Sequence, residues 1–360
     1  MVELAVVVPT YNESTNIAAL VRRLESVLAG RSWEVVFVDD DSPDGSASVI
    51  RALAREKPHV RCLQRIGRRG LSRAVVEGVL STSAPIVAVM DADLQHDEQV
   101  LPLMLERLDR EQLDMVVASR YVAGGSVDGW RADRVEMSRW ATRFTKWIVR
   151  TELADPMSGY FVMRRSTFEA AVRKLSGEGY KLLIDLLASS PIPPRVAELP
   201  YAFRPREAGE SKLDSAVIWA FAMLLIDKSV GRWVPARFVV FAAVGSAGVV
   251  VHFAVLSLLF KALGVDFAWS QGVATMIAMT SNFALNDAMT YRDRRHHGLR
   301  WVGALLTFYA VCGIGIVANV GVATALFDRE QAWFVAAAAG ALVGTVWNYV
   351  ASSAVTWRRA

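Results

Sequence analysis

The feature that most constrains the fold is the uneven distribution of apolar residues along the 360-residue chain. Before about position 215 charged residues are mixed with short apolar runs, whereas the part after Arg237 is dominated by long apolar stretches. These stretches cover residues 238–260, 267–290, 301–327 and 332–357. Each is close to the roughly 20 residues that a membrane-spanning helix needs. The sequence therefore predicts an N-terminal domain of mixed composition followed by an all-α transmembrane domain of four helices.

Basic residues near the ends of these stretches predict the orientation of the protein. Lys228, Arg232 and Arg237 precede the first stretch, the loop 292–300 (RDRRHHGLR) separates the second from the third, and Arg358 and Arg359 follow the fourth. The opposite loops carry Lys261 and Arg329 alone. Because Lys and Arg accumulate on the cytoplasmic side, we expect an integral protein of the cell membrane with a cytoplasmic N-terminal domain and cytoplasmic termini.

The remaining composition narrows the partners and the compartment. The net charge is +4, and the arginine clusters fall at predicted membrane edges, which favours anionic lipid headgroups over nucleic acid as partners. Cys62 and Cys312 fall in different domains and cannot crosslink either one, which fits a reducing compartment. The N-terminus has no basic region before its first apolar run, so no signal peptide is expected.

The N-terminal domain alternates strand-like and helix-like segments. Short apolar runs typical of buried strands occupy residues 4–8, 34–38, 60–63, 85–90 and 114–119. Helix-like spacing of apolar residues fills the segments between them, and Ser14 or Asn16 is a candidate N-cap of the first helix. This alternation predicts an α/β fold with a mainly parallel, Rossmann-like sheet covered by helices on both faces.

Polar clusters follow three of these strands. PTYNE (9–13) ends the first strand, Asp39, Asp40 and Asp41 follow the second, and DADLQ (91–95) follows the fourth. Ligands of such sheets bind beyond the carboxyl ends of the strands, so we expect the clusters to converge at one edge. Neither GxGxxG nor GxxxxGK[ST] is present, so neither a dinucleotide site nor a P-loop is indicated. A diphosphate bound at this acidic edge would need a metal ion between it and the carboxylates.

The segment DADLQ itself suggests a cation site. If the backbone stays extended beyond Met90, the side chains of Asp91, Asp93 and Gln95 project to one side. Two carboxylates and an amide oxygen suit a hard divalent cation that takes its other ligands from water and phosphate. The alternative is a turn in which an aspartate caps the helix that starts near Glu98. The position after a buried strand, beside another acidic cluster, favours the metal site.

The membrane part contains an internal repeat between residues 281–295 and 347–360. Asn282, Phe283, Thr290, Tyr291 and Arg292 align with Asn348, Tyr349, Thr356, Trp357 and Arg358, and Gly248 and His252 align with Gly315 and Asn319. The repeat predicts two duplicated helical hairpins in the same orientation. Because an intramembrane asparagine is costly unless it is paired or faces a cavity, these asparagines either hold helices together or line a lipid or sugar path.

Six segments together carry a family resemblance. They are PTYNE (9–13), VDDDSPDG (38–45), MDADLQH (90–96), ASRY (118–121), DPMSGYFVMRR (155–165) and FRPREAGESKL (203–213). They resemble family-2 glycosyltransferases of the GT-A fold and, more narrowly, dolichyl- or polyprenyl-phosphate mannose synthases. The apolar remainder resembles GtrA-like membrane domains. The implied organisation is a GT-A catalytic domain over 1–211, an interfacial amphipathic linker over 212–235 and a GtrA-like four-helix domain over 236–360.

The resemblance implies two sets of binding residues. Those for the nucleotide sugar are Pro9, Tyr11, Glu13, Val38, Asp40, Asp91, Ala92, Asp93, Gln95, Arg206 and Lys212. Within this set, Asp91, Asp93 and Gln95 would bind Mg²⁺ or Mn²⁺ at the donor diphosphate, and Arg206 and Lys212 would offset charge on the departing nucleotide. Those for the acceptor phosphate are Arg120, Arg131, Arg134 and Ser138, beside a membrane-touching segment at 139–149. Asp91, Asp93 and Arg120 are the expected catalytic residues.

Two further expectations concern single carboxylates. Asp155 would either support the site structurally or contact the sugar. Asp40 would point towards the base, where guanine offers two adjacent donors to a carboxylate and uracil offers one.

The predicted activity is therefore a metal-dependent, inverting transfer of a hexose, mannose from GDP-mannose, onto a polyprenyl (dolichyl-type) phosphate at the cytoplasmic face. The alternatives are the same chemistry with UDP-glucose or another nucleotide sugar, and a lipid-linked-sugar transporter with a fused loading domain. A processive polysaccharide synthase is disfavoured because the sequence has no QxxRW motif. The oligomeric state is not predicted.

Overall fold

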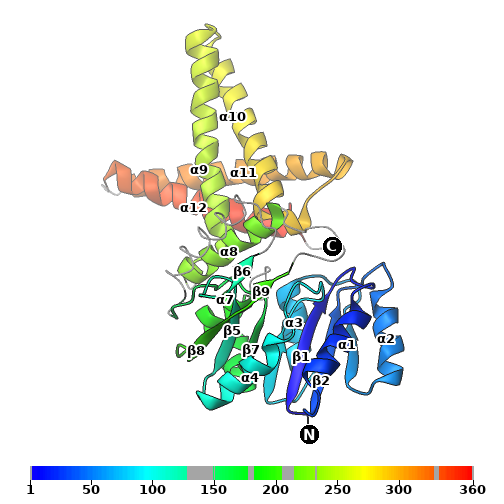
Figure 1. Ribbon diagram of the computed structural model, residues 1–360. Helices are drawn as coiled ribbons and strands as arrows, with labels where there is room; N and C mark the ends of the chain where they lie inside the picture. The colour runs from blue at the N-terminus through cyan, green and yellow to red at the C-terminus, as the bar shows by residue number, and fades with distance from the viewer. Residues whose placement is uncertain are drawn as a thin grey trace. The chain divides into compact units, whose positions relative to one another are not determined.

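The structure is a computed structural model that describes residues 2–127, 149, 151–176, 182–204, 215–231, 233–327 and 332–358. The chain divides into two compact units, Met1–Ser229 and Val230–Ala360. The first unit is an α/β domain and the second is built of long helices (Figure 1).

A seven-stranded sheet with strand order β3-β2-β1-β4-β7-β5-β8 forms the centre of the first unit. Its strands are β1 (Leu4–Thr10), β2 (Trp33–Asp39), β3 (Val60–Gln64), β4 (Ile86–Val89), β5 (Met115–Ser119), β7 (Phe161–Arg164) and β8 (Val196–Pro200). Strand β7 runs antiparallel to its neighbours β4 and β5, and the other pairs are parallel. A second, two-stranded sheet pairs β6 (Ser126–Val127) with β9 (Ala202–Phe203). The five predicted strands correspond to β1 to β5, and the sheet is mainly parallel as predicted.

Helices cover both faces of the large sheet (Figure 1). They are α1 (Ile17–Val27), α2 (Ser46–Glu56), α3 (Leu71–Leu80), α4 (Val100–Arg110), α6 (Arg165–Ala171) and α7 (Leu182–Ser189). Successive side chains of a strand point to opposite faces. Accordingly Val6 and Val8 of β1 pack into a core with α1, α2 and α4, whereas Val7 packs into a second core with α3, α6 and α7. The predicted two-faced α/β fold is confirmed.

One predicted helix cap differs from the structure. Asn16 occupies the N-cap position of α1 but makes no capping hydrogen bond through its side chain. Its amide nitrogen instead donates to Glu13 Oε2 at 2.7 Å. The Asn16 side chain therefore binds the nearby Glu13 carboxylate and does not cap the helix.

Helix α8 (Ser215–Val230) is tied to the interior of the first unit near its C-terminal end. The Lys228 ammonium lies 2.7 Å from Asp185 Oδ1 and donates to Ser189 Oγ at 2.8 Å. Asp185 is fully buried. Lys228 is thus the partner of a buried carboxylate and not an exposed charge ahead of the first apolar helix.

Four helices of the second unit cover the four predicted apolar stretches. They are α9 (Ala236–Leu256), α10 (Phe267–Leu285), α11 (Leu299–Phe327) and α12 (Trp333–Ala354), with π-helical turns at Ser257–Ala262 and Asn286–Thr290. Helix α9 packs along α10, and α11 along α12 (Figure 1). Among the described residues, Ala236–Ala262 and Leu299–Leu326 are long and apolar enough to cross a membrane. The count of four spans stays a prediction, and Arg232, Arg329 and Arg359 lie outside the described residues.

The two hairpins share one packing feature. A Cβ added to Gly248 would overlap the side-chain amide of Asn282, and a Cβ added to Gly315 would overlap that of Asn348. In each hairpin a glycine of the first helix therefore admits an asparagine of the second. The aligned pair Tyr291 and Trp357 stack on one another, with ring centroids 4.1 Å apart and an interplanar angle of 9°. The two Gly–Asn pairs of the sequence repeat thus have matched environments, and both asparagines contact the neighbouring helix, as expected for inter-helix packing.

Candidate active site

The three polar clusters lie at one edge of the large sheet. Strand β1 lies between β2 and β4, with Thr10 opposite Asp39 and Val7 opposite Val89. The carboxyl ends of these three parallel strands are therefore neighbours, as predicted. The order β3-β2-β1-β4 places the topological switch between β1 and β4, which is where open α/β sheets bind ligands.

The loop after β1 is held by the loop after β2. Three consecutive backbone N–H groups, those of Asn12, Glu13 and Ser14, donate at 3.0 Å to Ser42 Oγ, Ser46 Oγ and Asp44 Oδ2. Burial raises the pKa of Asp44, but hydrogen bonds from Ser14 and Ser46 outweigh it and hold the pKa below its usual value. The serines and aspartate of VDDDSPDGS are thus the brace that shapes the loop carrying Tyr11 and Glu13.

Asp40 is paired within the chain. Arg65 Nη1 donates to its Oδ1 at 2.5 Å and the Gly70 N–H donates to its Oδ2 at 2.6 Å. Burial outweighs these hydrogen bonds and the Arg65 charge, so the pKa of Asp40 is raised above its usual value. Each carboxylate oxygen keeps a second lone pair, so the predicted contact with a base stays a proposal. Arg65, fully buried and absent from the predicted set, is the residue that positions Asp40.

Tyr11 also has a basic neighbour that the sequence reasoning missed. The Arg69 guanidinium lies 4.5 Å from the centroid of the Tyr11 ring. A base that stacks on Tyr11 would use the opposite face of the ring or displace Arg69. The available signal was the segment RRGLSR (68–73), which contains three arginines and lies between the end of β3 and the first turn of α3.

The other predicted donor residues near these loops are placed by the strands. Pro9 of β1 pairs in register with Val38 of β2. Ala92 is buried in the loop after β4. Glu13 accepts from Asn16, as described above.

The expected extended backbone after β4 is wrong. The strand ends at Val89, and Leu94 has a φ of 62°, so the chain bends within the DADLQ segment. The bend leaves the Asp91 side chain 39% exposed and buries most of Asp93. Asp93 Oδ1 accepts from the Gln95 N–H at 3.2 Å, a local turn contact that an extended strand could not make.

Gln95 and the following histidine connect this loop to distant segments. Gln95 Nε2 donates to the Arg204 carbonyl at 3.0 Å, which leaves the amide oxygen as the atom suited to a cation. His96 is buried, with Nε2 3.3 Å from Asp91 Oδ2 and Nδ1 3.2 Å from the Tyr201 hydroxyl. Because an ionised Asp91 carboxylate accepts hydrogen bonds, the His96 Nε2–H donates to it, and in the neutral imidazole Nδ1 then accepts from the Tyr201 hydroxyl. His96 therefore orients Asp91. The residue belongs to the motif MDADLQH, but the sequence reasoning predicted no role for it.

The residues present fit a hard divalent cation. Asp91, Asp93 and Gln95 supply oxygen atoms, the ligand type that Mg²⁺ and Mn²⁺ prefer. They are fewer than the ligands such an ion binds, so water and phosphate oxygens would fill the other positions. In the described part of the chain, no group of three or more His, Cys, Asp or Glu side chains is placed to hold a metal ion.

Arg120 is bound in a buried ion pair. Its Nε and Nη2 each donate to the Asp155 carboxylate at 2.7 Å, and the two side chains are 8% and 0% exposed. Burial lowers the pKa of Arg120, but Asp155 outweighs it and raises the pKa above its ordinary value. Glu198 in turn accepts from the N–H groups of Ala154 and Asp155 at 2.7 and 2.9 Å. Of the two roles expected for Asp155, these contacts match the supporting one.

Five predicted residues lie outside the described residues. They are Arg131, Arg134 and Ser138 of the acceptor set and Arg206 and Lys212 of the donor set. Most of the segment 139–149 lies outside them as well.

Comparison with known proteins agrees with this architecture. Residues 5–171 match the model of glycosyl transferase family 2, and residues 240–357 match that of the GtrA/DPMS transmembrane domain. A dolichol-phosphate mannosyltransferase of Pyrococcus furiosus is 31% identical over 357 residues, 99% of each chain. One of Mycosarcoma maydis is 36% identical over 62% of this chain and 78% of its own length. An undecaprenyl-phosphate mannosyltransferase of Micrococcus luteus is 30% identical over 59% of this chain and 88% of its own length. The chain belongs to glycosyltransferase family 2, among the members whose catalytic domain is followed by a GtrA/DPMS transmembrane domain.

Proposed function

We propose that this protein transfers mannose from GDP-mannose to a polyprenyl phosphate, in a metal-dependent reaction that inverts the anomeric carbon. The observation that carries the proposal is the acidic sheet edge, where the loops after β1 and β2 meet the Asp91–Asp93 loop. It is supported by the likeness over 99% of the chain to a dolichol-phosphate mannosyltransferase.

The acceptor explains why no side-chain base is required. A phosphate monoester has a second pKa of about 6 and carries a nucleophilic oxyanion at pH 7. This oxygen attacks the anomeric carbon of mannose while the bond from that carbon to the GDP oxygen breaks. The products are mannosyl-phosphoryl-polyprenol and GDP, and the single displacement inverts the configuration.

The residues divide the work of this reaction. Asp91, Asp93 and Gln95 would hold Mg²⁺ or Mn²⁺, which when bound offsets the charge that develops on the GDP diphosphate. His96 fixes the orientation of Asp91. Pro9, Tyr11, Glu13, Val38, Asp40 and Ala92 would contact the nucleoside and sugar, with Arg206 and Lys212 at the diphosphate.

The acceptor side depends on cationic side chains near the membrane. Arg120, Arg131, Arg134 and Ser138 would bind the lipid phosphate, with Arg120 held in place by Asp155. The GtrA/DPMS domain would keep the enzyme at the cytoplasmic face of the membrane, where a water-soluble nucleotide sugar and a membrane lipid can meet.

The test is transfer by the purified full-length protein in detergent. Radiolabelled GDP-mannose, UDP-glucose and UDP-galactose are each incubated with polyprenyl phosphate and Mg²⁺ or Mn²⁺, and the lipid fraction is separated by chromatography. We expect label in a lipid product from GDP-mannose alone. Labelled lipid from UDP-glucose, with none from GDP-mannose, would overturn the choice of donor.

A further inference from the structure

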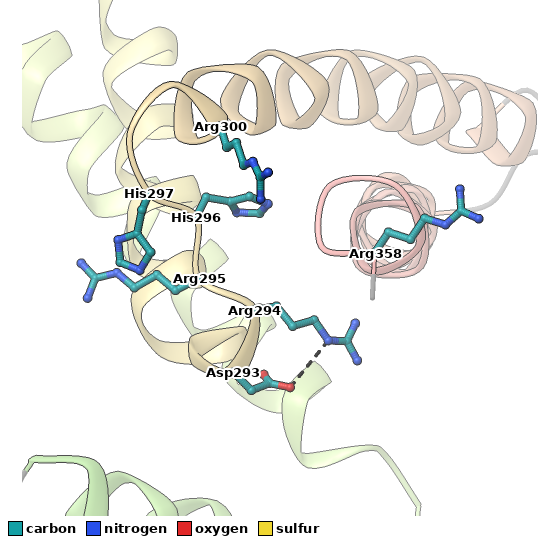
Figure 2. Close-up of a pocket in the computed structure, with 7 residues that line it drawn as sticks. All are labelled: Asp293, Arg294, Arg295, His296, His297, Arg300 and Arg358. Atoms are coloured by element: carbon teal, nitrogen blue, oxygen red, sulfur yellow. Dashed lines mark ion pairs between the residues drawn. The ribbon is translucent and has the colours of Figure 1, made fainter. Parts of the chain in front are cut away.

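A basic pocket of about 720 Å³ lies in the second unit, in the loop between α10 and α11. The term basic pocket is used below for this space. Its lining contains one carboxylate, Asp293, and six basic side chains, those of Arg294, Arg295, His296, His297, Arg300 and Arg358. Figure 2 shows Arg294, His296 and Arg300 extending from the loop and the start of α11, with Arg358 on the other side of the pocket.

Within the described residues, the ion pairs balance only part of the charge of this lining. Asp293 is shared between Arg237, at 3.1 Å, and Arg294, at 3.6 Å. Within the described parts of the chain, no carboxylate pairs with Arg295, Arg300 or Arg358. Four guanidinium groups around one space repel one another, and an anion between them removes that cost. The lining therefore has the composition of an anion site.

Buried and hydrogen-bonded residues support the lining of the pocket. Trp357 is fully buried and stacks on Tyr291, and its Nε1 donates to Asp287 Oδ1 at 3.0 Å. The Trp357 carbonyl accepts from Arg294 Nη1 at 2.8 Å, and the same Asp287 oxygen accepts from His296 Nδ1 at 2.8 Å. These contacts fix Arg294, His296 and the residue before Arg358 before any ligand arrives, which lowers the entropy cost of binding.

The surroundings of the pocket indicate an amphiphilic ligand. Leu299, Val302 and Leu306 of α11 are 91%, 50% and 62% exposed. Residues spaced by three and four lie along one side of a helix, so an exposed apolar strip starts beside the basic pocket. A free phosphate would use the arginines alone, whereas a lipid would use both the arginines and the strip.

We propose that the basic pocket binds the phosphate group of a membrane lipid, whose chains lie along the exposed strip of α11. The site is formed by residues of the second unit and goes beyond the transfer reaction proposed above. The phosphate has two sources of the same chemistry, a phospholipid headgroup or a polyprenyl phosphate. Guanidinium groups bind either through charge-assisted hydrogen bonds.

The experiment measures lipid binding to the purified full-length protein by native mass spectrometry from detergent. The lipids are phosphatidylglycerol, polyprenyl phosphate and, as a zwitterionic control, phosphatidylcholine. The test variant is Arg300→Gln/Arg358→Gln. The matched control is Arg292→Gln, which removes an exposed arginine of the same loop that does not line the pocket. Helix content and thermal unfolding of each variant are recorded by circular dichroism.

We expect Arg300→Gln/Arg358→Gln to weaken binding of an anionic lipid by about tenfold or more for each of the two arginines lost. We expect Arg292→Gln to leave the affinity within about twofold of wild type. Loss for both anionic lipids assigns the pocket to lipid phosphates in general, and loss for polyprenyl phosphate alone assigns it to the substrate or product lipid. If the double variant unfolds, Arg300→Lys/Arg358→Lys keeps the charge and is expected to retain part of the binding. Equal binding by the wild type and by whichever double variant folds, or an equal loss in the Arg292 control, would overturn the proposal.

Discussion

The acidic sheet edge of the first unit and the basic pocket of the second are suited to phosphate by opposite means. At the sheet edge, carboxylates surround the place where a diphosphate would bind, so a cation has to stand between ligand and protein. In the basic pocket, guanidinium groups line the space where we propose that a lipid phosphate binds, and they would contact it directly. The first arrangement would make binding depend on a metal ion, and the second would make it depend on ionic strength. In the proposed reaction, such a contrast would suit a diphosphate that leaves as part of GDP and a lipid phosphate that remains bound.

The largest effect should come from the acidic edge. Replacing Asp93 by Ala removes a proposed ligand oxygen, and because a methyl group cannot bind a hard cation, we expect transfer to fall by at least about a thousandfold. Initial rates with labelled GDP-mannose measure it. Glu106→Ala, an exposed carboxylate of α4, is the matched control and should leave the rate unchanged. Full activity of the wild type in excess chelator would show that the reaction does not need a metal ion.

The next effect concerns Arg120, a buried arginine of the first unit. Asp155→Asn leaves Arg120 buried without its carboxylate, which we expect to lower the free energy of unfolding by about 3–5 kcal/mol. Urea unfolding in detergent measures the loss. Removing the exposed partner of Arg110 by Glu106→Ala should cost less than about 1 kcal/mol. Similar costs for the two variants would mean that the Arg120–Asp155 pair is not the structural support described here.

A smaller effect separates acceptor from donor. Arg131→Ala should raise the KM for polyprenyl phosphate by about tenfold or more, the loss of one charge-assisted hydrogen bond, with the KM for GDP-mannose nearly unchanged. Initial-rate kinetics with each substrate varied in turn measure both constants. Equal changes in the two constants would argue against a separate acceptor-phosphate site.

The smallest effect tests the base. Asp40→Asn should narrow the gap between inhibition by GDP and by UDP, since a guanine offers two donors to a carboxylate and an amide accepts through one oxygen. Arg65→Lys is the control, because it keeps a positive charge near Asp40 and leaves the carboxylate intact. If the control narrows the gap as much as Asp40→Asn does, the base preference comes from the position of the loop.

The sequence predicted the parts of this structure that depend on local pattern. Strands β1, β2, β4 and β5 contain continuous apolar runs, and the clusters after β1, β2 and β4 meet because parallel strands share one carboxyl edge. The duplicated hairpins were visible because Gly248 with Asn282, and Gly315 with Asn348, recur in register.

The rest depends on contacts between segments far apart in the chain. The bend at Leu94 was missed because alternation after a strand looks the same whether the chain continues or turns. The pairing of Arg65 with Asp40 and of His96 with Tyr201 joins residues 25 and 105 positions apart, which no local pattern encodes. In the sequence, the basic loop 292–300 predicts orientation, and the pocket that it forms with Arg358 depends on contacts between segments distant in the chain, such as the stack of Tyr291 on Trp357.

The most direct test of the central claim, that the acidic edge binds a diphosphate through a metal ion, is calorimetric titration of the full-length protein with GDP. The titration is run in Mn²⁺ and in excess chelator, and polyprenyl phosphate binding is measured under the same two conditions. We expect chelation to weaken GDP binding by at least about tenfold, the loss of a divalent ion between like charges, while lipid-phosphate binding is unchanged. GDP binding of equal strength with and without the metal ion would contradict the claim.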